Sequence, residues 1–209
     1  GIYESDMSAS EIMKRIRPPP SKAVEEIETM EIPAYLVQPT LEHPKHNKFV
    51  MRWGIRAYPG LMYDVKQERV VFPIHHRGRL IDAVGRAVGT RMQPKWYRYT
   101  GDADYFTAGS GDVVLLVEDV VSAVVASQLM PDITALAILG TSLSDKHMAK
   151  VSSYRKVVIA LDPDAMDKTL EFRRAIELWT GIETVAMKLH DDIKYKVPED
   201  IKQLKDICK

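Results

Sequence analysis

The sequence predicts an α/β fold in which helices flank a parallel sheet, preceded by a smaller, basic α+β part. Two short runs of branched apolar residues carry this prediction, VVLLV at 113–117 and VVIAL at 157–161. Continuous apolar runs of this length are typical of strands that are buried on both faces of a parallel sheet. Each run stops at acid, Glu118 after the first and Asp162 and Asp164 after the second. Strand-like and helix-like segments then alternate along the chain, as in βα units.

Length and composition set modest bounds. The 209 residues are enough for one large domain or two small ones, and no apolar run approaches the ~20 residues of a membrane helix. The single cysteine, Cys208, excludes an internal disulfide and any cysteine-based zinc cluster built from this segment. We therefore expect a cytoplasmic protein with no membrane association. The chain begins at Gly1 without a signal-peptide pattern, so we expect a trimmed chain or a piece of a longer protein.

The net charge of zero conceals a segregation of charge along the chain. Residues 1–40 carry 4 Lys and Arg against 7 Asp and Glu, residues 41–100 carry 12 against 4, and residues 101–209 carry 13 against 18. The middle segment is thus +8, and its neighbours are −3 and −5. A basic part beside an acidic part predicts a polyanion-binding surface next to an acidic site. A solvated basic face is the alternative that charge counts leave open.

We expect three segments: an N-terminal helical segment over 1–40, a basic α+β part over 41–110 and the parallel α/β domain over 111–209. In the first, SASEIMKRIR at 8–17 predicts a helix that the three following prolines end. A second, weaker helix is expected over 22–30.

The basic part is expected to consist of short strands between residues 48 and 99. A hairpin is predicted from strands 70–74 and 80–88, because Arg-Gly-Arg stands between them. Gly85 inside the second strand indicates a bulge or a close backbone approach. The segment QPKWYRY at 93–99 interleaves aromatic and basic residues. Trp96 in it either stacks on a base or packs in the core, with equal weight for the two readings.

The acidic domain is expected to hold four parallel strands, because short connections join strand-like and helix-like segments in alternation. The strands are placed at 113–117, 135–139, 157–161 and 183–187. The helices are placed near 120–129, 144–153, 165–180 and 198–208.

The acidic residues after two of these strands predict a metal site. Ligands of open parallel sheets bind beyond the carboxyl ends of the strands. Asp162 and Asp164 leave an extended backbone on the same face, and Pro163 places them at or past the strand end. Together with Glu118 they offer oxygen ligands suited to Mg²⁺ or Mn²⁺. This pattern indicates phosphoryl-transfer chemistry on nucleotides or nucleic acid.

These residues resemble the Toprim family, a module of bacterial and bacteriophage primases, topoisomerases and several nucleases. The family has a glutamate after the first strand and Asp-x-Asp after the third, places filled here by Glu118, Asp162 and Asp164. The resemblance covers roughly residues 111–195. Two departures are Asp119, where the family usually has glycine, and Met166-Asp167, where an Ala-Gly pair is common.

The upstream segment 69–99 is similar to the polymerase-domain core of primases. The matching positions are Arg69, Gly78, Arg79, Gly85, Arg86, Lys95 and Tyr97. The resemblance therefore implies a DNA primase of bacteriophage or bacterial type, present as its RNA polymerase domain without the zinc-binding module. It implies Mg²⁺ or Mn²⁺ on the acidic trio, and nucleotide or template binding by Arg69, Arg79, Arg86, Lys95 and Tyr97. The expected partners are single-stranded DNA, ribonucleoside triphosphates and a replicative helicase, fused or separate.

Two other functions stay open at this level. A Toprim nuclease would use the same carboxylates to activate water, but hydrolysis does not explain the basic segment. A non-catalytic nucleic-acid-binding module is disfavoured by the complete acidic trio. Two further features are ambiguous. Asp191, Asp192 and Lys194 either support the metal site or form a solvated loop. His75 and His76 point to opposite faces of a strand, so we expect a hairpin shoulder there, not a shared metal.

Overall fold

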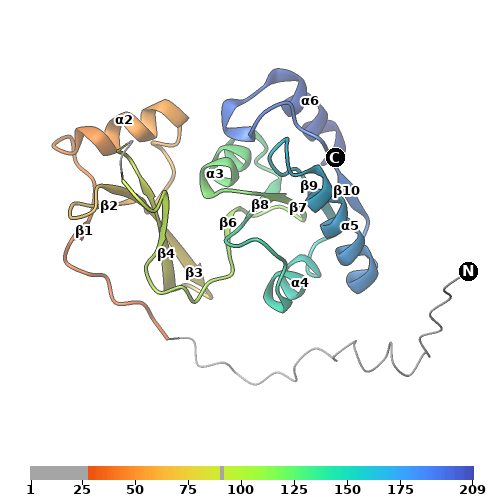
Figure 1. Ribbon diagram of the computed structural model, residues 1–209, viewed down its shortest axis with the longest axis horizontal. Coiled ribbons are helices and arrows are strands. Elements are labelled where there is room, and N and C mark those ends of the chain that lie inside the picture. The colour runs from red at the N-terminus through yellow and green to blue at the C-terminus, as the bar shows by residue number, and fades with distance from the viewer. Residues whose placement is uncertain (1–27, 90–91) are drawn as a thin grey trace, which may run out of the picture.

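The computed structural model describes residues 28–89 and 92–209 and contains two five-stranded sheets with helices packed around them (Figure 1). The helix predicted over 8–17 lies outside the described residues. Of the weaker helix predicted over 22–30, only 28–30 are described, and they form no helix. The buried side chain of Met30 and its backbone N–H bond to Leu80 attach this stretch to the first sheet.

The first sheet is antiparallel, with strand order β1-β2-β3-β4-β5. Its strands are β1 (Leu36–Val37), β2 (Met62–Asp64), β3 (Arg69–His76), β4 (Arg79–Ala87) and β5 (Trp96–Arg98). The predicted hairpin is confirmed as β3 and β4. Arg77 and Gly78 form its two-residue turn with φ of 50° and 76°, the left-handed pair that a tight hairpin requires.

The break in strand register of this hairpin lies at another position than the one predicted. The register shifts between Ile74 and His75, not at Gly85. Gly85 instead allows a close approach of side chains. A Cβ atom there would lie 3.0 Å from Cδ of Arg69 and 3.1 Å from the ring of Tyr99.

Helix α2 (Pro44–Trp53) corrects the expectation of strands from residue 48 onward. Pro44 at its first position and Gly54, in the left-handed conformation with φ of 66°, mark its two ends. Only His46 and Val50 of this helix are buried.

The second sheet has strand order β10-β9-β7-β8-β6. Its strands are β6 (Tyr105–Gly109), β7 (Val113–Val117), β8 (Ile133–Ile138), β9 (Lys156–Ile159) and β10 (Thr184–Ala186). Strands β7 to β10 are parallel, in the places that the sequence predicted. The four expected parallel strands are present, and β6 adds a fifth, antiparallel edge strand beside β8 that was not expected. Strand β6 thus belongs to this sheet, although it precedes the expected segment boundary at residues 110 and 111.

Helices cover both faces of the second sheet (Figure 1). Helix α3 (Val120–Leu129), α6 (Pro198–Ile207) and the short 3₁₀ helix η1 (Ile193–Tyr195) contribute buried residues to one face. Helices α4 (Asp145–Val151) and α5 (Met166–Thr180) cover the other. All four α-helices fall in the predicted places. In the part of the chain that the structure describes, no helix is long and apolar enough to cross a membrane.

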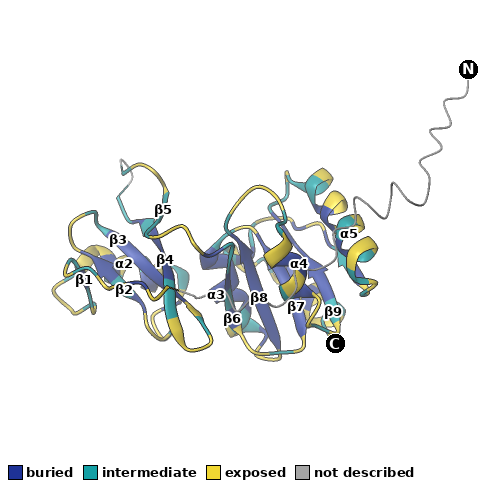
Figure 2. Ribbon diagram, turned by 90° about the horizontal axis from the view of Figure 1, so that it is seen from below, coloured by how far each residue is buried: buried dark blue, intermediate teal, exposed yellow. Residues whose placement is uncertain are grey.

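A single apolar core joins the two sheets, whose strands are largely buried (Figure 2). Phe72 of β3 packs edge-on against Phe106 of β6, with ring centroids 6.1 Å apart. Buried residues of α3 extend this core over the second sheet. The opposite face of the second sheet has its own core, formed with α4 and α5. Strand β7, with the sequence VVLLV, is therefore buried on both faces, as a continuous apolar run predicts.

A buried ion pair ties the two sheets together at their junction. The carboxylate of Asp82 on β4 is fully buried and accepts hydrogen bonds from Arg98 at 2.9 Å and from the backbone N–H groups of Ala83, Thr100 and Ala103. The Arg98 guanidinium also donates to the carbonyl of Leu139, just after β8, at 3.2 Å. Each charge at this junction is therefore balanced and hydrogen-bonded.

Candidate active site at the carboxyl edge of the second sheet

Acidic residues follow two neighbouring parallel strands at the same edge of the sheet. Strands β7 and β9 pair directly, with Leu116 opposite Ile159. Glu118 comes two residues after Leu116, and Asp162 comes three after Ile159, so both leave the sheet at its carboxyl edge. This is the edge where open parallel sheets bind ligands.

Asp162 lies in a crowded negative environment. Burial raises its pKa to about 7, and a hydrogen bond to Asp192 and the charges of Asp192 and Glu118 act in the same direction. Lys194 opposes the shift. Asp162, Glu118 and Asp192 therefore lie close enough to repel one another, although they come from three separate loops.

Lys194 lies among these carboxylates. Its Nζ atom is 2.6 Å from Oδ2 of Asp119 and also pairs with Asp192, and its side chain is only 12% exposed. Burial alone would lower the pKa of Lys194, but the charges and hydrogen bonds of these two carboxylates raise it. Burial would raise the pKa of Asp192, but its hydrogen bonds with Lys194 and Asp162 hold it below the ordinary value. The loop after β10 is thus part of the acidic edge, not a solvated loop.

The expected trio of Glu118, Asp162 and Asp164 is not gathered into one cluster. Glu118 and Asp164 are exposed, and no three His, Cys, Asp or Glu side chains of the described residues converge in a metal-binding arrangement. Carboxylates at one edge repel each other unless a cation lies between them. The type of donor nevertheless fits Mg²⁺ or Mn²⁺, because every donor here is a carboxylate oxygen. The negative charges of Glu118 and Asp192 also repel that of Asp162, and a bound cation would offset this repulsion.

Two of the predicted basic residues face this edge from the first sheet. Burial lowers the pKa of Arg86, while the charge of Asp119 raises it. The guanidinium of Arg86 lies over the ring of Trp96, 5.3 Å from its centroid. The charge of Lys95 contributes to the lowered pKa of Asp192. The acidic edge and the β4–β5 surface therefore lie close enough to interact electrostatically.

Arg79 lies away from Arg86 and Lys95. It pairs with His76 at the turn of the hairpin, whereas Arg86 pairs with Val70 near the other end of β4. Seven residues of extended strand separate the two arginines by about 23 Å. The expectation that Arg79 faces the same cleft as Arg86 is wrong, because the two arginines lie at opposite ends of β4 and Arg79 lies at the hairpin turn.

Arg69 and Tyr97 are engaged within the first sheet. Arg69 is fully buried, and its guanidinium donates to the carbonyl of Pro94 at 2.8 Å and to the side chain of Gln67 at 3.1 Å. It also lies over the ring of Tyr97, 5.4 Å from the centroid. Nη2 of Arg69 is buried without a partner among the described residues. A direct role of Arg69 in template binding is therefore contradicted by its burial, and Tyr97 forms part of its enclosure.

Trp96 packs against the core, which is one of the two roles expected for it. Its ring lies 6.4 Å from that of Phe72 and packs against the shared core. A further aromatic contact, between half-buried Trp53 and exposed Tyr195, is one that the sequence did not indicate. Trp53 at the end of α2 meets Tyr195 of η1 edge-on at 5.3 Å, and Arg52 lies over Trp53 at 4.9 Å. No signal pointed to this contact, because α2 itself was not predicted.

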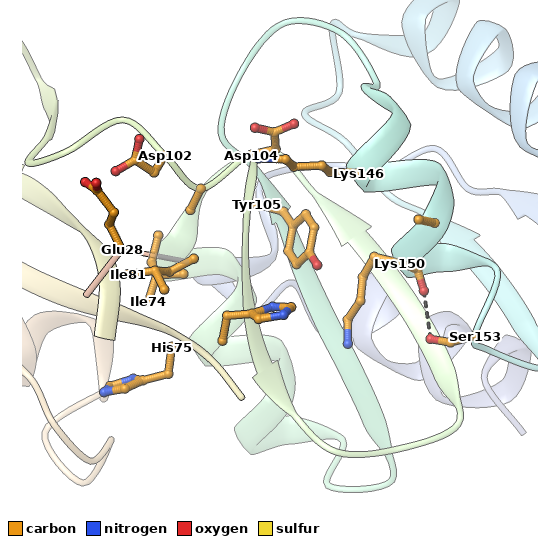
Figure 3. Close-up of a pocket in the computed structure, with 13 residues that line it drawn as sticks. Glu28, Ile74, His75, Ile81, Asp102, Asp104, Tyr105, Lys146, Lys150 and Ser153 are labelled. Carbon is orange, nitrogen blue, oxygen red and sulfur yellow. Dashed lines mark hydrogen bonds between the residues drawn. The ribbon is translucent and has the colours of Figure 1, made fainter. Parts of the chain in front are cut away.

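A separate cavity of about 700 Å³ lies between the end of the hairpin and α4 (Figure 3). Its walls include Ile74 and His75 from β3, Tyr105 from β6 and Lys150 from α4. The two histidines belong to this hairpin shoulder, as expected. The acidic strand ends are not among the residues that line it, so the cavity is distinct from the candidate active site.

Among known proteins, no family model and no curated sequence matches the chain. Solved structures do match. The catalytic domain of DnaG primase bound to single-stranded DNA has 22% identity and a TM-score of 0.56, with 78% of this chain and 58% of that chain covered. The fold is similar to that of DNA primase catalytic domains. The Aquifex aeolicus primase, with zinc-binding and RNA polymerase domains, has 22% identity and a TM-score of 0.56 over 83% and 43% of the two chains.

A DNA primase domain from Pseudomonas aeruginosa has 20% identity and a TM-score of 0.53, covering 81% of this chain and 60% of that one. At these identities the likeness is one of fold. The chain spans less than two thirds of the length of each of these primase structures.

Proposed function

We propose that this chain is the catalytic part of a DNA primase, a DNA-templated RNA polymerase that makes short RNA primers on single-stranded DNA. The observation that carries the proposal is the opposition of two surfaces within a primase-like fold. Acidic residues at the carboxyl edge of the second sheet face Arg86 and Lys95 of the first sheet. Nucleotidyl transfer needs this pairing of a metal-binding edge with phosphate-binding cations.

The reaction joins the 3′-hydroxyl of one nucleotide to the α-phosphate of the next and releases pyrophosphate. Little covalent work falls to the protein, so positioning and charge stabilisation dominate. Glu118, Asp162 and Asp164 would hold Mg²⁺ or Mn²⁺, which supplies charge neutralisation on the attacking and leaving oxygens. Asp164 is exposed and makes no hydrogen bond or ion pair with the other described residues, which leaves its oxygens available.

The chain's own cations would bind the phosphates. Arg86 offers a planar fork suited to bidentate phosphate contacts, and Lys95 offers a point charge beside Asp192. The segment 41–100, at +8, would attract single-stranded DNA through phosphate contacts that carry little sequence information. Within this proposal, ribonucleoside triphosphates are substrates, and a replicative helicase is the expected partner. The bacteriophage or bacterial type and a cytoplasmic location remain predictions.

The direct test is an assay of the purified chain with single-stranded DNA, ribonucleoside triphosphates and Mg²⁺ or Mn²⁺. The expected product is short RNA that depends on both template and metal. Cleaved DNA without RNA would favour the nuclease reading. Binding of DNA with neither product would favour a non-catalytic module.

A further inference from the structure

Tyr195 is an exposed aromatic residue at the margin of the acidic edge. It lies on η1, directly after Lys194, whose ammonium pairs with Asp119 and Asp192. Tyr195 itself is 52% exposed. Its ring is therefore available to a ligand that approaches the edge.

The short helix η1 holds this ring in a fixed position. The N–H of Tyr195 donates to the carbonyl of Asp192 at 2.8 Å, and the N–H of Lys196 donates to the carbonyl of Ile193 at 2.9 Å. Lys196 has φ of 56°, a left-handed conformation that few residues other than glycine adopt. The side chain of Ile193 is buried in the shared core. Tyr195 is thus presented by a turn that is anchored on both sides of it.

Helix α2 supports the ring from the side of the first sheet. Trp53 meets Tyr195 edge-on, with ring centroids 5.3 Å apart and an interplanar angle of 76°. Such a contact occupies at most one face of each ring. Trp53 is half-buried and packs against the shared core, so its own ring is held in place. The pair therefore joins α2 to η1 and leaves about half of Tyr195 open to solvent.

Cations surround this pair of rings. The exposed guanidinium of Arg52 lies 4.9 Å from the centroid of Trp53, and Nζ of Lys194 lies 5.7 Å from that of Tyr195. A charge on Tyr195 would raise the pKa of Arg86, so these two side chains lie near each other. Proteins that bind single-stranded nucleic acid combine such groups, with bases stacked on aromatic rings and cations along the phosphates. Several cations around one ring fit a strand of successive phosphates better than a single nucleotide.

We propose that Tyr195 stacks on a base of single-stranded DNA, with Trp53 as its supporting ring and Arg52 on an adjoining phosphate. This inference rests on the proposed function for its ligand, and it names a side chain that holds the template strand beside the acidic edge. The contact involves neither the carboxylates nor a metal ion.

The experiment measures binding of labelled oligothymidine and of an abasic strand of equal length by fluorescence anisotropy, with a chelator present. The abasic strand keeps every phosphate and lacks the bases, so the wild type should bind oligothymidine more tightly. Tyr195→Leu should weaken oligothymidine binding about 5- to 100-fold and leave the affinity for the abasic strand unchanged. Tyr195→Phe keeps the ring and should bind both strands as the wild type does.

Trp179→Leu is the matched control. Trp179 is an aromatic residue of similar exposure, at 48%, near the end of α5. About 20 Å of helix separate it from the start of α5 at the acidic edge. Its substitution should change the affinity for neither strand. Thermal melting checks that each variant is folded.

Equal affinity of the wild type for the two strands would overturn the inference. So would an equal loss for both strands, or no loss for either, in a folded Tyr195→Leu variant, and so would the same base-dependent loss in Trp179→Leu. If Tyr195→Leu does not fold, the wild type with a strand that carries 5-iodouracil decides. A photochemical cross-link to Tyr195, identified by mass spectrometry, supports the inference, and its absence contradicts it.

The same measurements separate the inference from the proposed function. A wild type that binds no single-stranded DNA would overturn both. Base-dependent binding through Tyr195 without primer synthesis would contradict the proposed function alone. Primer synthesis with no base-dependent binding at Tyr195 would contradict the inference alone.

Discussion

The junction between the sheets and the acidic edge both contain enclosed carboxylates, but the negative charge is neutralised at the junction and only partly neutralised at the edge. At the junction, one carboxylate, Asp82, meets one guanidinium and three backbone N–H groups. At the edge, Asp162 shares its surroundings with Glu118 and Asp192, and Lys194 offsets only part of their charge. The balanced region joins the two sheets, and the region with surplus negative charge is the one that we propose binds a metal ion.

The pKa values express this difference. Burial would raise the pKa of Asp82, but hydrogen bonds from Thr100, Arg98, Ala103 and Ala83 lower it overall. At Asp162, burial and acidic neighbours together raise the pKa to about 7. A carboxylate with a lowered pKa stabilises the native state when ionised, and one with a raised pKa destabilises it. Asp82 at the junction and Asp162 at the edge thus differ in the sign of their pKa shift.

The largest expected effect is on catalysis at the edge. Asp162→Asn should reduce primer synthesis by at least about 100-fold, the upper range for loss of a group that orients a metal. It should not destabilise the fold, because it removes one of several repelling charges. Primer yield and thermal melting of the same preparation measure the two effects. A variant that loses activity only through unfolding would show that Asp162 belongs with the structural acids.

At the junction, we expect a loss of stability. Asp82→Ala leaves Arg98 partly buried without its partner and should lower the free energy of unfolding by about 3–5 kcal/mol. Urea denaturation measures this loss. Asp112→Ala is the control, because its ion pair with Arg155 is exposed, and breaking it should change stability by less than about 1 kcal/mol. Equal effects of the two substitutions would contradict the structural role of the junction.

The two regions should also respond oppositely to pH in metal-free protein. Asp82 has a lowered pKa, so its contribution is present above about pH 4 and is lost as the pH falls through its folded-state pKa. Asp162 has a raised pKa, so the native state binds its proton more tightly than the unfolded chain. Its contribution is therefore lost as the pH rises from about 4 to about 7.

Melting temperatures between pH 3 and 8 in the presence of a chelator check this prediction. Asp162→Asn should remove the decline toward neutral pH, and Asp82→Asn should weaken the decline toward acid. An unchanged profile in both variants would remove the electrostatic distinction between the regions.

The smallest expected effect concerns the basic surface opposite the edge. Arg86→Ala should weaken binding of single-stranded DNA and reduce the slope of log affinity against log salt by roughly one phosphate contact. Arg79→Ala is the matched control on the same strand, because Arg79 lies at the far end of the hairpin. Fluorescence anisotropy at several salt concentrations measures both. A larger effect of Arg79→Ala would place the template path along the hairpin instead.

The sequence predicts the parallel part of the second sheet well, because continuous apolar runs have few alternative structures. Strands β7 to β10 and helices α3 to α6 lie in the predicted places. Helix α2 and strand β6 were missed for a physical reason. The helix has no side-chain N-cap hydrogen bond and no acidic residue in its first turn to mark its start, and the strand YFTAG joins its sheet through contacts with β8, which follows it by about 25 residues.

The site was predictable only as far as strand ends can be located. Glu118 and Asp162 leave neighbouring strands, which follows from their places after apolar runs. The ion pair between Lys194 and Asp119 joins residues 75 positions apart, and no local pattern indicates it. The burial of Arg69 was equally hidden, because its partners come from the turn before β3 and from Pro94. Residue type indicated a phosphate ligand there, and tertiary packing made it a core residue.

The most direct test of the central claim compares two exposed acids near the start of α5, Asp164 and Asp167. Each is replaced by alanine, and primer synthesis on single-stranded DNA is measured with Mn²⁺ and ribonucleoside triphosphates. The account predicts that Asp164→Ala makes no RNA, while Asp167→Ala retains most of the wild-type activity. Full metal-dependent activity of Asp164→Ala would contradict the assignment of the acidic edge as the site of nucleotidyl transfer.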